Sequence, residues 1–271
     1  MRRNVPLVPL TPREQLRAGR LPLRLSQLMV GLVLYGVAMG MLVRSTLGLD
    51  PWDVFHDGVQ KLTGLSFGTV VILTGVAVLA FWVPLRQWPG VGTVANTVVI
   101  GLATDATLAL LTAPESLLWR WVLLLGGIVV NGAAGAIYIG SQLGPGPRDG
   151  LMTGLAQRTG LSIRLVRTSL ELTVLAAGWL LGGVVGLGTV LYALLIGPTI
   201  QFFLPLVTVD ISERAEQLRA QRRGSALESE GEGEDGVGPG PSQEAPGHGE
   251  GPARVDDVVD EEDRPACCGQ R

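Results

Sequence analysis

One stretch of this chain occurs twice. Residues 47–66 read LGLDPWDVFHDGVQKLTGLS, and residues 143–162, 96 positions later, read LGPGPRDGLMTGLAQRTGLS. Shifting the chain by the same 96 positions gives identity at 29 of the 87 positions between Arg24 and Leu110. A gap-free internal match of this length indicates that the chain is built from two copies of one structural unit. Positions 96 residues apart are called equivalent below.

The repeated unit is strongly apolar. Charged residues make up 17% of the chain, against about 25% in average soluble domains. Each copy contains three apolar runs close to the roughly 20 residues that a helix needs to cross a membrane. We therefore predict an all-α polytopic membrane protein with six transmembrane helices, as two three-helix repeats over residues 24–112 and 119–207. The runs cover about 25–43, 66–85, 91–112, 121–140, 162–182 and 187–207.

The arginines predict the orientation. With the N-terminus in the cytoplasm, 15 Lys and Arg residues fall in cytoplasmic segments and only Arg44, Lys61 and Arg120 in outer ones. This positive-inside bias places both termini in the cytoplasm. Three spans per repeat would make the second copy enter from the opposite side, which predicts an inverted repeat as in many transporters. Twenty arginines against one lysine are typical of a GC-rich bacterial genome, so we expect a bacterial plasma membrane.

The two ends of the chain differ in charge. Residues 1–23 form a basic segment, whereas residues 211–271 carry 7 Lys and Arg against 15 Asp and Glu. The part from 224 onward is rich in glycine, proline and acids and has no aromatic residue, so we predict a disordered cytoplasmic tail. Cys267 and Cys268 are adjacent in it, and two ligands are too few for a structural zinc site.

The repeated motif predicts a short helix after the first span of each copy. Asp50 and Pro51 fit the cap and the first turn of such a helix, and Gly64 fits its left-handed end. About twelve residues cannot cross the bilayer, so each helix is interfacial or re-entrant. One interpretation is a half-helix whose N-terminus faces a binding cavity. The other is an elbow between spans, in which Asp53 and Asp149 are helix caps worth about 1 kcal/mol each.

An anion-binding loop at GPGPRD is disfavoured by the sequence. Pro145 and Pro147 have no N–H to donate, and Asp149 would place a negative charge at the helix terminus.

Ionisable residues within spans are candidate site residues because a charge in lipid costs several kcal/mol. Asp105 lies in the third predicted span and Glu171 in the fifth, with Arg167 four residues before Glu171 on the same helical face. Asn96 and Asn131 add amide groups. The alternatives are a structural ion pair for Glu171 and Arg167, a packing residue for Asp105, and interhelical hydrogen bonds for the asparagines.

The sequence carries no signature of an enzyme. Its two histidines are His56 and His248, and metal-ligand spacing, a nucleophile elbow and a nucleotide-binding P-loop are all missing. We predict no metal, no cofactor and no nucleic-acid partner. The favoured function is a small-solute transporter or permease-like protein in contact with membrane lipids. The alternative is a membrane scaffold or regulatory protein that acts through a partner. The oligomeric state is not indicated.

The motif G-x-x-P-x-D followed by G-L-S, present twice over residues 24–207, resembles the YczE/YyaS/YitT family of bacterial membrane proteins, most closely its YczE-like branch. The resemblance implies the membrane architecture and assigns no substrate. Trp52 in the first copy stands opposite Arg148 in the second, so the two short helices have diverged. The motif positions that it carries over are Pro51, Asp53, Gly58, Pro147, Asp149 and Gly154.

Overall fold

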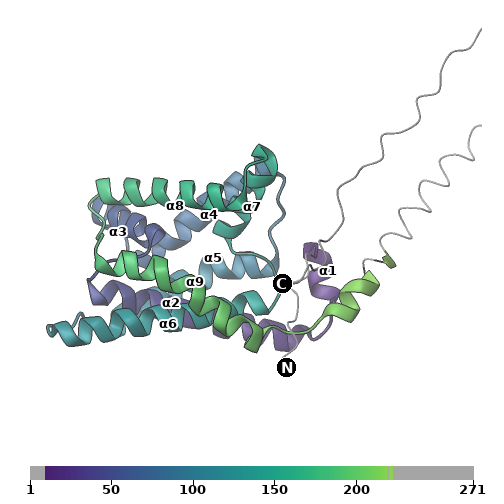
Figure 1. The fold of residues 1–271 in the computed structure, drawn as a ribbon, viewed down its shortest axis with the longest axis horizontal. Helices are drawn as coiled ribbons and strands as arrows, with labels where there is room; N and C mark the ends of the chain where they lie inside the picture. The colour runs from purple at the N-terminus through teal and green to yellow at the C-terminus, as the bar shows by residue number, and fades with distance from the viewer. Residues whose placement is uncertain (1–9, 219, 222–271) are drawn as a thin grey trace, which may run out of the picture. The chain divides into compact units, whose positions relative to one another are not determined.

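The computed structural model describes residues 10–218 and 220–221, so the predictions for the acidic tail and its two cysteines lie outside the described residues. All regular structure in these ranges is helical, which confirms the predicted all-α class (Figure 1). The helices are α1 (Pro12–Arg17), α2 (Leu21–Ser45), α3 (Pro51–Thr63), α4 (Phe67–Leu85), α5 (Val91–Leu110), α6 (Leu117–Gly140), α7 (Pro147–Thr159), α8 (Ile163–Leu180) and α9 (Leu187–Val207). Helical residues also follow Ile211.

Five of these helices are long and apolar enough to cross a membrane, namely α2, α4, α5, α6 and α9. α8 stands where the fifth span is predicted, but it has 18 residues and carries Arg164, Arg167 and Glu171. It does not meet the same hydropathy requirement, so the sixth span stays a prediction. Large apolar side chains on the outer faces are exposed, for example Leu73, Leu102, Val129 and Phe202, as expected for helices in contact with lipid.

The two short helices begin and end where the motif predicts. In α3 the carboxylate of Asp50 accepts a 2.9 Å hydrogen bond from the N–H of Asp53, and the helix ends at Gly64 with φ 74°. α7 ends in the same way at Gly160, with φ 69°. Its N-cap residue is Gly146, which has no side chain to accept a hydrogen bond. The N-terminus of α3 is therefore closed by a carboxylate, and that of α7 is left without a side-chain cap.

Contacts between the two copies are reciprocal. A Cβ built on Gly31 of α2 would meet Tyr138 of α6, and one built on the equivalent Gly127 would meet Leu42, which is the equivalent of Tyr138. In the first turns of α5 and α9, Gly92 donates to the carbonyl of Leu143 at 2.9 Å, and Gly188 donates to that of Leu47 at 2.8 Å. Each of these contacts from one copy to the other thus has an equivalent in the opposite direction.

Small residues bring the helices of each copy together. A Cβ on Gly36 of α2 would lie 2.6 Å from that of Ala103 in α5, and one on the equivalent Gly132 of α6 would lie 2.4 Å from Thr199 in α9. Such close approach is the usual way in which helices associate in lipid, where the hydrophobic effect between them is absent. In Figure 1, α2 and α6 run side by side, and α3, α4, α7 and α8 lie together across from them.

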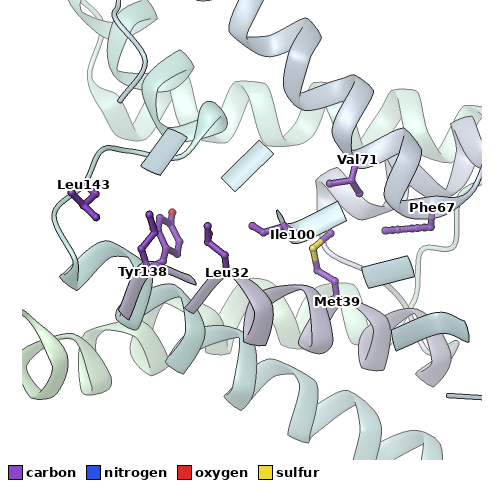
Figure 2. Close-up of a cluster of buried hydrophobic side chains, with 8 residues drawn as sticks. Leu32, Met39, Phe67, Val71, Ile100, Tyr138 and Leu143 are labelled. Carbon is purple, nitrogen blue, oxygen red and sulfur yellow. The ribbon is translucent and has the colours of Figure 1, made fainter. Parts of the chain in front are cut away.

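The larger apolar core lies between α2 and the helices α4, α5 and α6. Figure 2 shows Leu32 and Met39 pointing from α2 toward Ile100, with Phe67 and Val71 of α4 beyond. A second cluster includes Leu42 of α2 and Leu124 and Ile128 of α6, with Tyr192 and Ile196 of α9. The core therefore joins both copies rather than belonging to either one.

Arg24, which the orientation argument counts as a cytoplasmic charge, is fully buried. Its guanidinium donates to the carbonyls of Gln15 at 2.6 Å, Ser141 at 2.8 Å and Gln142 at 2.6 Å. These backbone carbonyls follow α6 or lie in α1, so Arg24 ties the two segments to the start of α2. It therefore has a structural role in addition to its place in the predicted charge bias.

The two copies differ in how α4 packs on α5 and how the equivalent α8 packs on α9. α4 packs on α5 through glycines, because a Cβ on Gly101 would lie 2.5 Å from the carbonyl oxygen of Gly68. In the second copy Arg164 replaces Gly68, and a Cβ on Gly197, the equivalent of Gly101, would meet nothing within 4 Å. Within the described part of the chain, no comparable packing joins α8 to α9.

This difference predicts opposite effects for one substitution at two equivalent positions. Gly101→Ala forces α4 and α5 apart and should reduce the free energy of unfolding by about 1–3 kcal/mol, the usual range for overpacking. Gly197→Ala should leave stability unchanged or slightly higher, because the methyl group enters open space. Melting temperatures of the purified variants in detergent test this, and equal losses would contradict the structure.

Candidate functional site

A cavity of about 350 Å³ lies where the two short helices begin. Asp50, Pro51 and Trp52 line it from the start of α3, and Gly146 to Asp149 line it from the start of α7. The remaining lining residues come from α2, α4, α5, α6, α8 and α9. The half-helix interpretation of the motif therefore describes the geometry: both short helices direct their N-termini at one cavity, where the helix dipole is positive.

Trp52 and Arg148 occupy equivalent positions and contact each other. The guanidinium carbon of Arg148 lies 4.8 Å from the centre of the Trp52 ring, a cation–π arrangement. Two arginines in this place would repel each other, which accounts for the divergence of the two motif copies. Nη2 of Arg148 also lies 3.9 Å from Oδ1 of Asp53.

Among the described residues, Arg148 donates no hydrogen bond at all. Its contacts are the ring of Trp52 and the distant carboxylate of Asp53, and its side chain is 27% exposed. A guanidinium has five N–H donors, so this one is available to a molecule in the cavity.

Three polar residues of α3 form a buried cluster beside Arg148. Nδ1 of His56 lies 3.1 Å from Oδ1 of Asp53, and both side chains are sealed from solvent. Burial raises the pKa of Asp53 to about 6, although Arg148 acts to lower it. Burial likewise raises the pKa of Asp50 to about 6, assisted by the neighbouring Asp53. For His56, burial lowers the pKa to about 3, so its ring is neutral near pH 7.

Several buried polar atoms around the cavity have no partner. They are Nε1 of Trp52, Oδ2 of Asp53, Nε2 of His56 and Nδ2 of Asn131. Leaving such a group unpaired costs about 1–3 kcal/mol, and native structures rarely tolerate several together. Three of these residues, Trp52, His56 and Asn131, line the cavity.

Tyrosine and asparagine exchange places between the copies. Tyr35 is the equivalent of Asn131, and Asn96 is the equivalent of Tyr192; all four line the cavity. The hydroxyl of Tyr192 donates to Oδ1 of Asn131 at 2.9 Å. Both predicted asparagines therefore reach the cavity, and at least Asn131 also serves as an interhelical hydrogen-bond partner.

Asp149 does not cap the N-terminus of α7, although its Oδ2 lies beside it, 3.3 Å from the position of a Cβ built on Gly146. Its Oδ2 accepts a 3.0 Å hydrogen bond from the hydroxyl of Tyr138 in α6. The helix start has no side-chain cap, and Gly146 lines the cavity beside it. The N–H groups of the first turn therefore have no side-chain acceptor, while the carboxylate of Asp149 keeps a negative charge beside them.

The predicted pair on α8 is formed. Nε of Arg167 donates to Oε1 of Glu171 at 2.9 Å, and both residues line the cavity. The two side chains are 59% and 33% exposed, respectively. This pair is open to solvent rather than sealed, and the cavity that it lines is also lined by residues of α9.

The structure places Asp105 elsewhere. Its carboxylate accepts from the hydroxyl of Ser66 at 2.5 Å and from the N–H of Gly68 at 2.7 Å. It thus fastens the start of α4 to α5 and is not among the residues that line the cavity. We interpret it as a structural residue and leave it out of the site.

Sequence reasoning missed most of the aromatic and buried acidic members of the site. Tyr35, Tyr138 and Tyr192 lie on three different spans, and no spacing in the chain connects them. The usable signal was the offset between the copies, because Tyr35/Asn131 and Asn96/Tyr192 are equivalent pairs. Within the described ranges, no group of three or more His, Cys, Asp or Glu side chains is placed to hold a metal ion.

The two predicted acids should differ in their effect on stability. Asp105→Ala leaves the buried N–H of Gly68 without its acceptor and should lower the free energy of unfolding by about 1–3 kcal/mol. Glu171→Gln removes an exposed ion pair of the kind worth about 0.3–0.5 kcal/mol. Thermal unfolding of both variants in detergent checks this order, and a larger loss for Glu171→Gln would make that pair structural.

Comparisons with known proteins place this fold in a family. A family model described as "Family of unknown function (DUF6198)" matches residues 22–205. An uncharacterized protein of Haemophilus influenzae is 44% identical over 68% of this chain and 84% of its own length. The uncharacterized membrane protein YczE of Bacillus subtilis is 32% identical over 74% of this chain and 96% of its own.

The uncharacterized protein YyaS of the same bacterium is 25% identical over 66% of this chain and 90% of its own. No solved structure matches. The resemblance that the repeated motif indicates is confirmed by the family match and by both Bacillus relatives. Together with the apolar helices, these matches show that the chain is an integral membrane protein and belongs to the family of unknown function DUF6198.

Proposed function

We propose that this protein is a transporter of a small polar solute and that the cavity between α3 and α7 is its binding site. The observation that carries the proposal is the meeting of two helix N-termini, unpaired polar atoms and an exposed Arg167–Glu171 pair at one cavity of about 350 Å³. A volume of this size falls in the usual range for small-molecule sites. No catalytic role is proposed for any residue.

The proposed architecture is a six-span inverted repeat. The reciprocal contacts of Gly31 with Tyr138 and of Gly127 with Leu42 support a two-fold axis between α2 and α6, because only a two-fold relation makes a contact return in the opposite sense. Adjacent antiparallel spans put that axis in the plane of the membrane. Transporters with inverted repeats bind substrates where the repeats meet, often at the ends of broken helices.

The loosely packed side of the cavity is the proposed route of entry. α4 is held to α5 by glycine contacts, whereas α8 lacks such packing on α9 within the described residues. Arg167 and Glu171 lie on this side. A motion of α8 relative to α9 would open the cavity without breaking the core shared by α2 and α6.

The alternative function is a scaffold or regulatory protein that acts through a partner. Charges sealed in pairs away from solvent would favour it, since they then serve packing alone. Asp105 has a packing role of a different kind, because its carboxylate accepts hydrogen bonds from Ser66 and Gly68 and not from a cation. The pair on α8 and Arg148 do not, because both are partly exposed and line the cavity. The site therefore favours transport.

A cavity-filling variant tests the proposed site. Gly197 lines the cavity, and a side chain there enters open space, so Gly197→Leu should fold and occupy part of the binding volume. Purified protein would be screened by thermal shift against amino acids, sugars, and small organic anions and cations. A solute bound in the cavity should raise the melting temperature of the wild type and not of the variant.

If no solute raises the melting temperature of the wild type more than that of the Gly197→Leu variant, the proposed binding site is wrong. For a solute that passes this screen, flux into proteoliposomes should be mostly lost in Glu171→Gln while its melting temperature stays near that of the wild type. Full flux in that variant would remove Glu171 from the mechanism.

The proposed orientation places both termini in the cytoplasm. A reporter that is active only in the periplasm should be inactive when fused after residue 210 and active when inserted in the 113–116 loop. The opposite pattern would invert the orientation, and activity at both sites would contradict an even number of spans.

A further inference from the structure

We propose that Arg148 binds the carboxylate group of a small monovalent organic anion and that Asp53 takes up one proton when this anion binds. This inference rests on the proposed function, because it assigns the substrate class and the coupled ion to the same cavity. The proton comes from the aqueous phase and converts the Asp53 carboxylate to the neutral acid. No bond in the anion is made or broken.

Arg148 is placed for anion recognition. It reaches the cavity, stacks on Trp52 and donates no hydrogen bond among the described residues. A guanidinium matches a carboxylate in a bidentate manner. The start of α7 adds the N–H of Arg148 and that of Asp149, which have no side-chain cap, and the positive end of the helix dipole. Both features favour a negative group at the same place.

A singly charged anion fits better than a doubly charged one. Three other carboxylates line the cavity, Asp50, Asp149 and Glu171, and the second arginine, Arg167, is already bonded to Glu171. One uncommitted positive side chain therefore faces the ligand. A phosphate or dicarboxylate would bring a second negative charge toward these acids without a partner for it.

Anion binding is coupled to protonation of Asp53 because the anion and Asp53 both interact with Arg148. Its Nη2 is 3.9 Å from Oδ1 of Asp53, and among the described residues Arg148 is the arginine within ion-pair distance of that carboxylate. An anion that engages Arg148 withdraws this stabilisation. Asp53 is fully buried, and a buried carboxylate without a counter-charge takes a proton instead. Its Oδ2 has no partner and is the free position for that proton.

The groups around Asp53 are bonded in ways that favour Asp53 as the proton acceptor. His56 is neutral near pH 7 because burial lowers its pKa to about 3, so it stays a hydrogen-bonding neighbour. Burial raises the pKa of Asp50 to about 6 as well, but Asp50 accepts from the N–H of Asp53, which favours its ionised form. Asp57 is bonded to Lys61 and to the N–H of Val184. From the other elements, Tyr35, Tyr192, Arg167 and Glu171 line the cavity, and Phe67 of α4 meets the ring of His56 edge to face.

The sign of the pH dependence is determined by these groups. Burial raises the pKa of Asp53 to about 6 in the empty cavity, so the residue is mostly ionised at pH 7 and binding must add a proton. Affinity for the anion should therefore rise as pH falls toward 6 and level off below it, where Asp53 is already protonated. Between the pKa values of the empty and occupied states, the change approaches tenfold per pH unit, as linkage requires.

The test uses the purified full-length protein with benzoate and L-lactate as probes and benzamide and lactamide as uncharged controls of matched shape. Both acids have a pKa of roughly 4 and stay ionised from pH 6 to 8. Calorimetry in buffers of different ionisation enthalpy counts the protons bound. We expect the anions, and not the amides, to bind with uptake of up to one proton, and Arg148→Gln to abolish binding.

Asp53→Asn keeps the shape of the side chain and removes its titration. It should bind the probes with no proton uptake and with an affinity independent of pH. The matched control is Asp149→Asn, at the equivalent position, which should retain proton uptake whatever its affinity. If Asp53→Asn still takes up the proton, or if Asp50→Asn loses it instead, the assignment to Asp53 is overturned.

Failure of the inference can be separated from failure of the proposed function. Binding of amides as well as anions, binding without proton uptake, or phosphate binding more tightly than benzoate would overturn the inference while leaving a binding cavity. Absence of binding by both anions, with other solutes still stabilising the wild type over Gly197→Leu, would overturn the substrate class alone. If no solute does so, the cavity itself is not a binding site.

Discussion

Two short helices, α3 and α7, begin inside the protein, and the rest of the structure is arranged around that constraint. A helix that begins within a membrane protein leaves N–H groups in its first turn that lipid cannot satisfy. Here both such ends are directed at one cavity between the two copies. The α3 terminus is closed by Asp50, and the α7 terminus is not closed by any side chain. The asymmetry leaves one electropositive helix end free to meet a ligand.

Close packing of glycines makes this arrangement rigid on one side only. Gly31 and Gly127 let α2 and α6 approach, and Gly68 and Gly101 do the same for α4 and α5. Because bilayer lipid competes poorly with such tight contacts, these pairs form a fixed frame. The second copy has Arg164 in place of Gly68, and its α8 lacks that contact with α9 in the described region. Loss of one glycine contact thus opens the side on which Arg167 and Glu171 lie.

The charge of Arg148 is shared among several neighbours rather than committed to one partner. Arg148 faces the ring of Trp52, the carboxylate of Asp53 and the open volume, and it is committed to none of them by a hydrogen bond. A fully paired arginine would be a structural element, because breaking a buried pair costs several kcal/mol. An arginine that is weakly held by two neighbours exchanges partners at low cost. This property lets a ligand at one face change the protonation of a residue at the other.

The sequence by itself determined the local and periodic features. The two copies, the helical class, the start of α3 at Pro51 and its end at Gly64 follow from composition, repeat offset and capping chemistry, all of which act over a few residues. It also placed Arg167 and Glu171 on one helical face, since a four-residue spacing sets that face regardless of the fold.

Only the tertiary structure decided which of these residues meet. Asp105 and Glu171 are alike in sequence as isolated acids in apolar runs, yet one fastens α4 to α5 and the other lines the cavity. Tyr35, Tyr138 and Tyr192 join the site from three spans, and Arg148 finds Trp52 only because the short helices converge. The physical reason is that spacing along the chain determines the face of one helix, whereas the site depends on how faces from different helices pack against one another.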